Sequence, residues 1–194
     1  QRRGGKGITG MVTREEDAVR RLIVCDTHDN VLFFTERGRV FQSRAFDLPD
    51  AKRQAKGIPL VNVIDCDPGE QVTALVTIRD YDRDYMVMAT ASGEVKKTPL
   101  ADFKEVRRNG KIAMDLEKDD EFVAAKLCHD DDEIVMITSN GQAIRFRVSE
   151  LRSASRPSGG GSRRAGTTGW LRTRWRAFRH ACCMSSARRR PAGR

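Results

Sequence analysis

The sequence has few aromatic residues and no long apolar run. Phe, Trp and Tyr make up 6% of its 194 residues, so a core must be built mainly from aliphatic side chains. No stretch approaches the roughly 18 apolar residues that a membrane-spanning helix needs, so we expect no membrane partner. The chain begins with Gln1 rather than methionine, and no signal-peptide pattern follows. We therefore expect a piece of a longer protein.

Clustered metal ligands are also missing. The five cysteines stand singly or as one adjacent pair, with no C-x-x-C motif and no Cys/His spacing typical of zinc. The run from His129 to Glu133 is interpreted as a surface turn rather than a metal site. We predict no metal and no cofactor in this chain, and the cysteine usage favours a reduced, cytoplasmic setting.

The positive charge is unevenly distributed. The formal net charge is +9, but residues 158–194 hold ten arginines and neither Asp nor Glu, which leaves −1 for residues 1–157. We therefore separate a folded region, 1–160, from a basic low-complexity tail, 161–194. One interpretation is a disordered tail. The other is translation out of frame from a GC-rich gene, in which case the neighbouring reading frame would restore the pattern of the first region.

A unit of about 50 residues recurs three times before the tail. Its first landmark is an apolar segment that ends in Thr-x-x-Gly, at residues 32–38, 86–93 and 134–141. A basic, glycine-containing loop is the second landmark. The third is an apolar segment after an acidic turn. An apolar residue follows each Thr-x-x-Gly glycine by ten positions, and the third landmark recurs at equivalent sites: Leu48, Phe103 and Leu151, then Val19, Val72 and Val123.

The unit predicts about four short β-strands. Its apolar segments are short, rich in β-branched residues and bounded by turn residues. Asn140-Gly141 is a strong hairpin signal because both residues tolerate positive φ, and Ser92-Gly93 and Arg37-Gly38 occupy the same place. No segment sustains a helical period, although residues 45–56 and 101–110 have room for a short helical turn. We predict an all-β fold, a propeller-like array of four-stranded blades.

Charge follows the same period. Segments 37–57, 92–112 and 140–160 carry +4, +3 and +3, whereas 8–36, 58–91 and 113–139 carry −3, −4 and −7. Equivalent positions of repeats lie on one face, so we predict a continuous positive belt and a negative opposite side, against the alternative of an ordinary mixed-charge surface. Such a belt suits a polyanion. The predicted contacts are Arg39, Arg44, Lys52, Arg53, Lys96, Lys97, Arg107, Arg108, Arg145 and Arg147.

The first seven residues combine glycines with cations. Glycine allows positive φ and exposes backbone amides to an anion, and the basic side chains supply charge. The stretch is no Walker loop, because the Gly-Lys-Ser/Thr ending is absent. We expect all seven residues to contact the anion: Gln1, Arg2, Arg3, Gly4, Gly5, Lys6 and Gly7.

This heptad resembles the box motif of the C-terminal domain of the DNA gyrase A protein, and the resemblance extends to about residue 160. It implies a partial β-pinwheel, a propeller variant whose blades exchange strands, with an incomplete first blade. It also implies that double-stranded DNA wraps around the outer rim, through the box and the repeated basic positions. In the family, this wrapping supports ATP-dependent negative supercoiling of DNA.

The resemblance further implies partners. The rest of the gyrase A protein and the gyrase B protein would complete a heterotetramer in the bacterial cytoplasm, at the nucleoid, with ATP and Mg²⁺ bound elsewhere. We assign no catalytic residue, because the cleavage tyrosine of the family belongs to a region absent here, and Tyr81 and Tyr85 lie in an acidic loop. Two alternatives stay open: the equivalent domain of topoisomerase IV, which usually lacks an intact box, and a propeller that serves as a protein-interaction platform.

Overall fold

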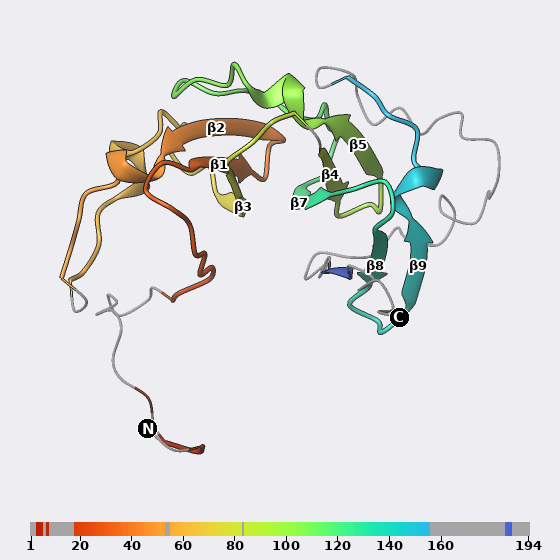
Figure 1. Ribbon diagram of the computed structural model, residues 1–194, viewed down its shortest axis with the longest axis horizontal. Coiled ribbons are helices and arrows are strands. Elements are labelled where there is room, and N and C mark those ends of the chain that lie inside the picture. The colour runs from red at the N-terminus through yellow and green to blue at the C-terminus, as the bar shows by residue number, and fades with distance from the viewer. Residues whose placement is uncertain are drawn as a thin grey trace, which may run out of the picture.

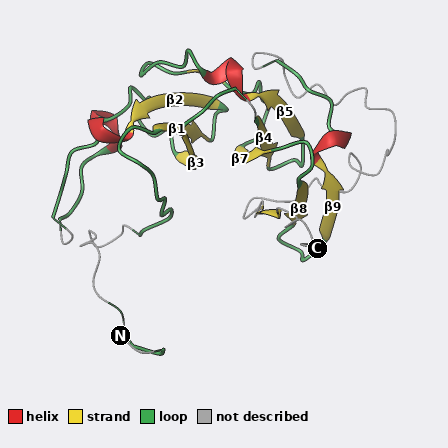
Figure 2. Cartoon of the chain, viewed as in Figure 1, coloured by secondary structure: helices red, strands yellow, loops and turns green. Residues whose placement is uncertain are grey.

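The structure, a computed structural model, describes residues 3–5, 7, 18–52, 55–82, 84–155 and 185–187. This part of the chain consists of β-strands and short 3₁₀-helices without an α-helix, which confirms the all-β prediction (Figure 2). None of its helices is long and apolar enough to cross a membrane. The strands are β1 (Asn30–Thr35), β2 (Arg39–Arg44), β3 (Val72–Ile78), β4 (Tyr85–Thr90), β5 (Val95–Pro99), β6 (Lys111–Ile112), β7 (Phe122–Cys128), β8 (Glu133–Ile137), β9 (Ala143–Arg147) and β10 (Ser185–Ala187). The 3₁₀-helices are η1 (Ala45–Asp47), η2 (Leu60–Asn62), η3 (Leu100–Phe103) and η4 (Val148–Glu150).

Three equivalent β-hairpins, β1–β2, β4–β5 and β8–β9, carry the repeat. In each, the turn glycine has a φ between 73° and 91°, the left-handed region that glycine adopts at least cost. Its amide donates to the carbonyl of the threonine three positions earlier, which closes the turn. The pairs are Gly38 with Thr35 at 3.0 Å, Gly93 with Thr90 at 3.1 Å and Gly141 with Thr138 at 2.9 Å. The predicted hairpin turns are confirmed.

Each of the first two hairpins is completed by strands from later in the chain. β3 pairs antiparallel with β1, and β7 pairs antiparallel with β4. With β6 on β2, the first sheet has the order β3-β1-β2-β6, whereas the second sheet has the order β5-β4-β7. The fourth position of the second sheet holds only an isolated bridge between Lys97 and Ser153. Because β3 and β7 each follow the hairpin that they complete, neighbouring repeats are tied by strand exchange, as the β-pinwheel prediction required.

The three sheets follow one another along an arc (Figure 1). β3 and β7 lie on its concave side, and the second strand of each hairpin, β2, β5 or β9, lies toward its convex side (Figure 1). The 3₁₀-helices η1, η3 and η4 follow these second strands directly, so the predicted helical turns at residues 45–56 and 101–110 are present. The arrangement directs the loops after each hairpin to the same side of the array.

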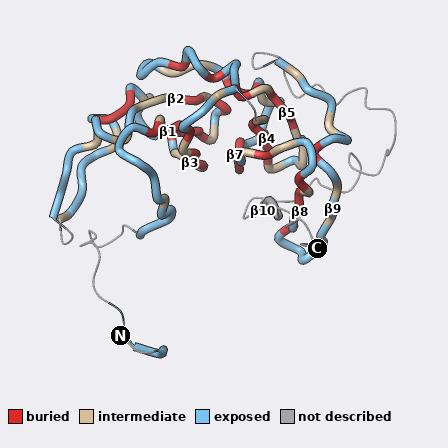
Figure 3. Tube along the Cα trace, viewed as in Figure 1, coloured by how far each residue is buried: buried red, intermediate tan, exposed pale blue. Residues whose placement is uncertain are grey.

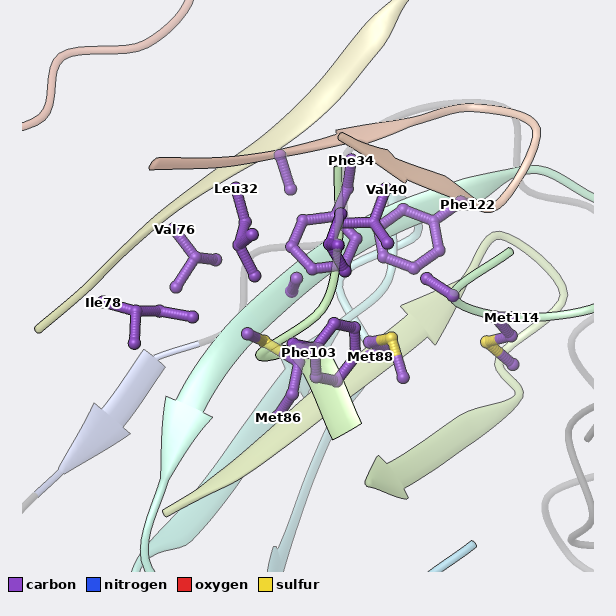
Figure 4. Packing of buried hydrophobic residues seen from close by; sticks show 14 of the residues in the cluster. Leu32, Phe34, Val40, Val76, Ile78, Met86, Met88, Phe103, Met114 and Phe122 are labelled. Carbon is purple, nitrogen blue, oxygen red and sulfur yellow. The ribbon is translucent and has the colours of Figure 1, made fainter. Parts of the chain in front are cut away.

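The largest buried cluster lies between the first two sheets (Figure 3). Phe34 on β1 stacks on Phe122 of β7, with ring centroids 5.3 Å apart and an interplanar angle of 5°. Phe103 of η3 meets Phe34 edge to face at 6.1 Å (Figure 4). All three rings are fully buried, so they connect three repeats through one core.

A second cluster joins the middle sheet to the third. Ile134 and Met136 of β8 pack with Val87 of β4, and Cys128 ends β7 beside them. Burial, and next the nearby carboxylate of Asp132, raises the pKa of the Cys128 thiol to about 11. The thiol is therefore neutral at physiological pH and acts as a small apolar core group.

The periphery differs from the prediction at both ends. Val19 was predicted to lie on a strand, but residues 18–29 form no strand. In the third sheet, β8 pairs with β9 and with the three residues of β10, which is the part of the tail that the structure describes. The predictions for the rest of segment 161–194 lie outside the described residues.

Candidate nucleic-acid interface

In the opening basic segment, the structure describes Arg3, Gly4, Gly5 and Gly7, and all four residues are exposed. Gly4 has a φ of 81° and Gly7 a φ of 74°, as expected for a loop that turns its amides outward. Gly5 does not share this conformation. Within the described residues, a side chain added at Gly4 or Gly7 would meet nothing within 4 Å. Gln1, Arg2 and Lys6 lie outside the described residues.

Besides Arg3, six of the predicted cations, all from the repeats, are exposed in the described part of the chain. Arg44 ends β2, and Lys52 lies in the loop after η1. Arg107 and Arg108 lie in the loop after η3. In Figure 1, β2, β9 and the loop after η3 lie toward the convex side of the arc, whereas the loop after η1, which carries Lys52, runs away from the end of the arc. We call this set the rim cations: Arg44, Lys52, Arg107, Arg108, Arg145 and Arg147. Arg53, which was also predicted, lies outside the described residues.

Arg108 and its neighbours form the most structured part of this set. The Arg108 guanidinium donates to the Asn62 carbonyl at 2.7 Å, and its Nε lies 3.8 Å from an Asp65 carboxylate oxygen. Gly110, with a φ of 77°, places its Cα against the Phe41 ring, so that a side chain there would lie 2.5 Å from that ring. The loop is thus fixed at its base while Arg107 and Arg108 stay exposed.

Arg145 and Arg147 lie on β9 with alternate residues exposed. Arg145 lies 3.6 Å from the Glu133 carboxylate, and the Arg147 amide donates to the Glu150 side chain at 3.3 Å. An exposed ion pair such as Arg145–Glu133 contributes about 0–1 kcal/mol, so little free energy opposes its exchange for a phosphate.

Lys96 and Lys97 correct the sequence prediction, because both side chains are buried, at 2% and 5% exposure. The Lys96 ammonium donates to the Ala113 carbonyl at 3.3 Å. The Lys97 ammonium lies 2.5 Å from Asp130 Oδ1, 3.4 Å from the Val148 carbonyl and 4.3 Å from the centre of the Tyr85 ring. A buried ammonium held by protein groups cannot neutralise a phosphate in solvent. Both lysines instead connect their strand to other segments of the fold.

Arg39 is also held within the fold. Its guanidinium lies 2.9 Å from Asp67 and 3.1 Å from the fully buried Glu70 side chain, and it stacks over Phe41 at 4.8 Å. Glu70 also accepts a hydrogen bond from the Thr35 hydroxyl at 2.5 Å. Removal of Arg39 would leave the Glu70 carboxylate buried and short of a cation. Its primary role here is structural.

The repeat pattern did not predict Phe46 as an exposed aromatic residue. It stands on η1 with 53% of its surface exposed. The Arg44 guanidinium lies 5.7 Å from the centre of its ring, and the His28 ring meets it edge to face at 6.4 Å. The equivalent positions of η3 and η4 hold Ala101 and Ser149, so the repeat gave no signal for an aromatic residue here.

Carboxylates just before the first two hairpins contact basic side chains within the fold. Arg79, which follows β3, lies 3.1 Å from Asp29, and its other nitrogen lies 2.5 Å from Asp26. At the next repeat His129 Nδ1 lies 2.6 Å from Asp84 Oδ1, a close contact without hydrogen-bond geometry. The His28 amide, and next the Arg79 charge, lower the pKa of Asp26.

The run from His129 to Glu133 is a turn, as predicted. The His129 amide donates to the Asp132 side chain at 2.8 Å, and the Asp132 amide donates back to the His129 carbonyl at 3.2 Å. Within the described ranges, no group of three or more His, Cys, Asp or Glu side chains is arranged to hold a metal ion.

Comparison with known proteins identifies relatives over most of the repeat region. Residues 1–26, 29–79, 84–129 and 132–160 match the family described as DNA gyrase C-terminal domain, beta-propeller. The chain is 40% identical over 157 residues to the DNA gyrase A protein of Clostridium acetobutylicum, which covers 80% of this chain and 19% of that protein. It is 43% identical over 160 residues to the DNA gyrase A protein of Mycobacterium bovis, with 82% and 19% covered. The chain thus spans about a fifth of the length of these relatives.

Solved structures show the same fold. The C-terminal domain of DNA topoisomerase IV matches with a TM-score of 0.61 and 30% identity, over 67% of this chain and 41% of that one. A DNA gyrase A C-terminal domain matches with a TM-score of 0.58 and 20% identity, over 76% and 49%.

Proposed function

Because the chain belongs to the DNA gyrase C-terminal domain family, we propose that it binds double-stranded DNA along the convex side of its blade array and wraps the duplex around it. The observation that supports this proposal is the placement of the rim cations. All but Lys52 lie on the second strands of the hairpins or in the loop after η3, and these segments lie toward the convex side of the arc (Figure 1). A curved row of cations matches the path of a bent polyanion.

The energetics require several such contacts. Bending DNA by 40–90° over a short site costs on the order of 1–6 kcal/mol, which phosphate contacts must offset. Each contact releases counterions, so binding weakens steeply as salt rises. Phosphate contacts position the duplex without reading its sequence, so we expect little base specificity. The opening heptad adds exposed backbone amides to the same interaction.

In the whole enzyme, we propose that this wrapping supports ATP-dependent negative supercoiling, because a wrapped segment fixes the handedness of the DNA crossing before strand passage. The rest of the gyrase A protein and the gyrase B protein would complete the heterotetramer and hold the cleavage tyrosine, ATP and Mg²⁺. This assembly would act in the bacterial cytoplasm at the nucleoid. The intact opening heptad, Gln1 to Gly7, favours gyrase over topoisomerase IV.

A protein-interaction platform is the second candidate. The acidic segments 58–91 and 113–139 carry their carboxylates mainly in the turns that flank β3 and β7, and these turns would bind a basic protein partner. A competition experiment with excess unlabelled DNA at low salt distinguishes DNA binding from protein binding. It would compete away a DNA ligand but leave a protein bound to the acidic side in place.

Substitution of Arg107 and Arg108 by alanine tests the rim. Both side chains are exposed, so the fold should persist, and we expect duplex affinity to fall for every sequence tested. If two phosphate contacts are lost, the slope of log affinity against log salt should become shallower by about 1.8. Fluorescence anisotropy of a labelled 40-base-pair duplex, titrated at several NaCl concentrations, measures both quantities.

Lys118 and Lys126 provide the matched control, because both are exposed and lie in the segment that supplies β7 of the concave side. The variant K118A/K126A removes the same charge from the other side of the array. We expect its salt slope to stay within error of the original chain. Equal losses in the two double variants would show that binding follows total charge, which would overturn the proposed rim.

The opening heptad is tested by wrapping rather than by affinity. We expect the original chain to change the linking number of DNA circles that are closed by ligase in its presence. The variant R2A/R3A/K6A should lose this change, since the cations of the heptad would no longer hold the end of the wrap. The control K118A/K126A, which removes two cations from the other side of the array, should keep it. A topoisomer distribution that the original chain leaves unchanged would refute wrapping.

A further inference from the structure

Phe46 presents an aromatic ring to solvent at the end of the first hairpin. It lies on η1, which follows β2, and β2 lies toward the convex side of the arc (Figure 1). Among the phenylalanines and tyrosines that the structure describes, only Phe46 is exposed, with 53% of its surface in solvent. The ring stands next to Arg44, one of the rim cations. Its place is therefore on the surface that we propose for DNA.

The exposure of Phe46 belongs to its position in the repeat. The equivalent positions, eight residues after each turn glycine, hold Ala101 and Ser149. Ala101 belongs to the middle hairpin, which packs against another sheet on both sides, and it is still exposed. In contrast, Phe103 is fully buried two positions later. A ring at the position of Phe46 thus faces solvent even where neighbouring repeats are present on both sides.

The backbone under the ring is fixed. The Ala45 amide donates to the Asp29 carbonyl at 2.9 Å, and the Phe46 amide donates to the Thr27 carbonyl at 3.1 Å. The His28 ring meets the Phe46 ring edge to face, with centroids 6.4 Å apart. A side chain that is already held in one orientation loses little freedom when it binds a ligand. The ring is therefore suited to a specific contact.

A cation accompanies the ring. The Arg44 guanidinium lies 5.7 Å from the ring centre, and Arg44 is exposed. The two acidic residues of the preceding turn, Asp26 and Asp29, both pair with Arg79. Asp47 follows the ring on η1, but consecutive residues of a 3₁₀-helix point about 120° apart. The charge that shares the face of the ring is therefore the guanidinium.

An exposed apolar ring beside a guanidinium suits the minor groove of DNA. Arginine enters this groove, and an apolar side chain next to it can insert between two base pairs, partly unstack them and kink the duplex. Pyrimidine–purine steps such as TpA are the easiest to kink. A kink concentrates bending at one point, which reduces the smooth bending that the remaining contacts must support.

We propose that Phe46 is a wedge that inserts from the minor groove at a pyrimidine–purine step and kinks the duplex at the first hairpin, with Arg44 in the groove beside it. This inference rests on the proposed DNA binding. Because Ala101 and Ser149 carry no ring, the wedge acts once among the described hairpins. It therefore gives the array a preference for a particular DNA step at one point, whereas its phosphate contacts read no sequence.

Permanganate oxidation tests the wedge, because permanganate attacks thymines whose bases are unstacked. The probe is a 40-base-pair duplex with one central TpA step, saturated with the full 194-residue chain. We expect the original chain to raise the reactivity of the central thymines. Phe46→Ala should lose this increase although fluorescence anisotropy still shows a saturated complex. Phe46→Trp should keep it, because it supplies another flat apolar ring.

Val61→Ala is the matched control, because it removes another exposed apolar side chain, 55% exposed, from the 3₁₀-helix η2. It should keep the increased reactivity. Equal thymine reactivity in saturated complexes of the original chain and of Phe46→Ala would overturn the wedge, leave DNA binding in place and point to a protein partner for the ring. An original chain that binds no duplex would overturn the proposed function and the wedge together.

Discussion

Replacement of Phe34 by alanine is expected to lower the free energy of unfolding by about 3–5 kcal/mol. The ring is fully buried and stacks on Phe122 while it meets Phe103 edge to face. These three residues come from β1, β7 and η3, so the cavity would open where the first two sheets join (Figure 4). Aromatic pairs of this geometry add about 0.5–1.5 kcal/mol beyond buried area, and both pairs would be lost.

Urea denaturation followed by circular dichroism measures this change, with the slope of the transition checked for each variant. Phe46→Ala is the matched control, because it removes the same atoms from a half-exposed ring. We expect its effect to stay within about 0.5 kcal/mol. Similar losses for the two variants would contradict the assignment of Phe34 to the central core.

Gly38→Ala is the second substitution with a large expected effect, about 2–5 kcal/mol in total from a backbone cost and a steric cost. The backbone φ at Gly38 is 73°, where a side chain costs about 1–2 kcal/mol. A methyl group there would also lie 2.3 Å from the Met114 carbonyl oxygen, which belongs to the backbone and cannot rotate away. Forced displacement of packed neighbours adds about 1–3 kcal/mol.

Gly141→Ala separates these two causes. Gly141 occupies the same turn of the third hairpin with a φ of 78°, but nothing lies within 4 Å of its added side chain. The Gly141→Ala variant should therefore be destabilised only by the backbone cost, about 1–2 kcal/mol. Thermal or urea denaturation of both variants gives the comparison. A Gly38 variant no less stable than the Gly141 variant would mean that residues 113–114 do not pack on the first turn as the structure has them.

The sequence determined the local features. The Thr-x-x-Gly motif requires a turn residue at positive φ, so three glycines at one period were enough to predict three hairpins. The apolar position ten residues after each turn glycine recurs in the sequence, and Phe103 at this position is fully buried. The positive φ of Gly4 and Gly7 was likewise inherent in residue type.

The tertiary structure decided which cations face solvent. β5 lies in the middle sheet with a neighbour on each face, so consecutive residues Lys96, Lys97 and Thr98 are all buried. β9 has a neighbour on one face, and Arg145 and Arg147 stay exposed. A charge sum over some twenty residues cannot distinguish these cases. Whether a side chain meets solvent depends on the sheet packed against its strand, and that sheet comes from a distant part of the sequence.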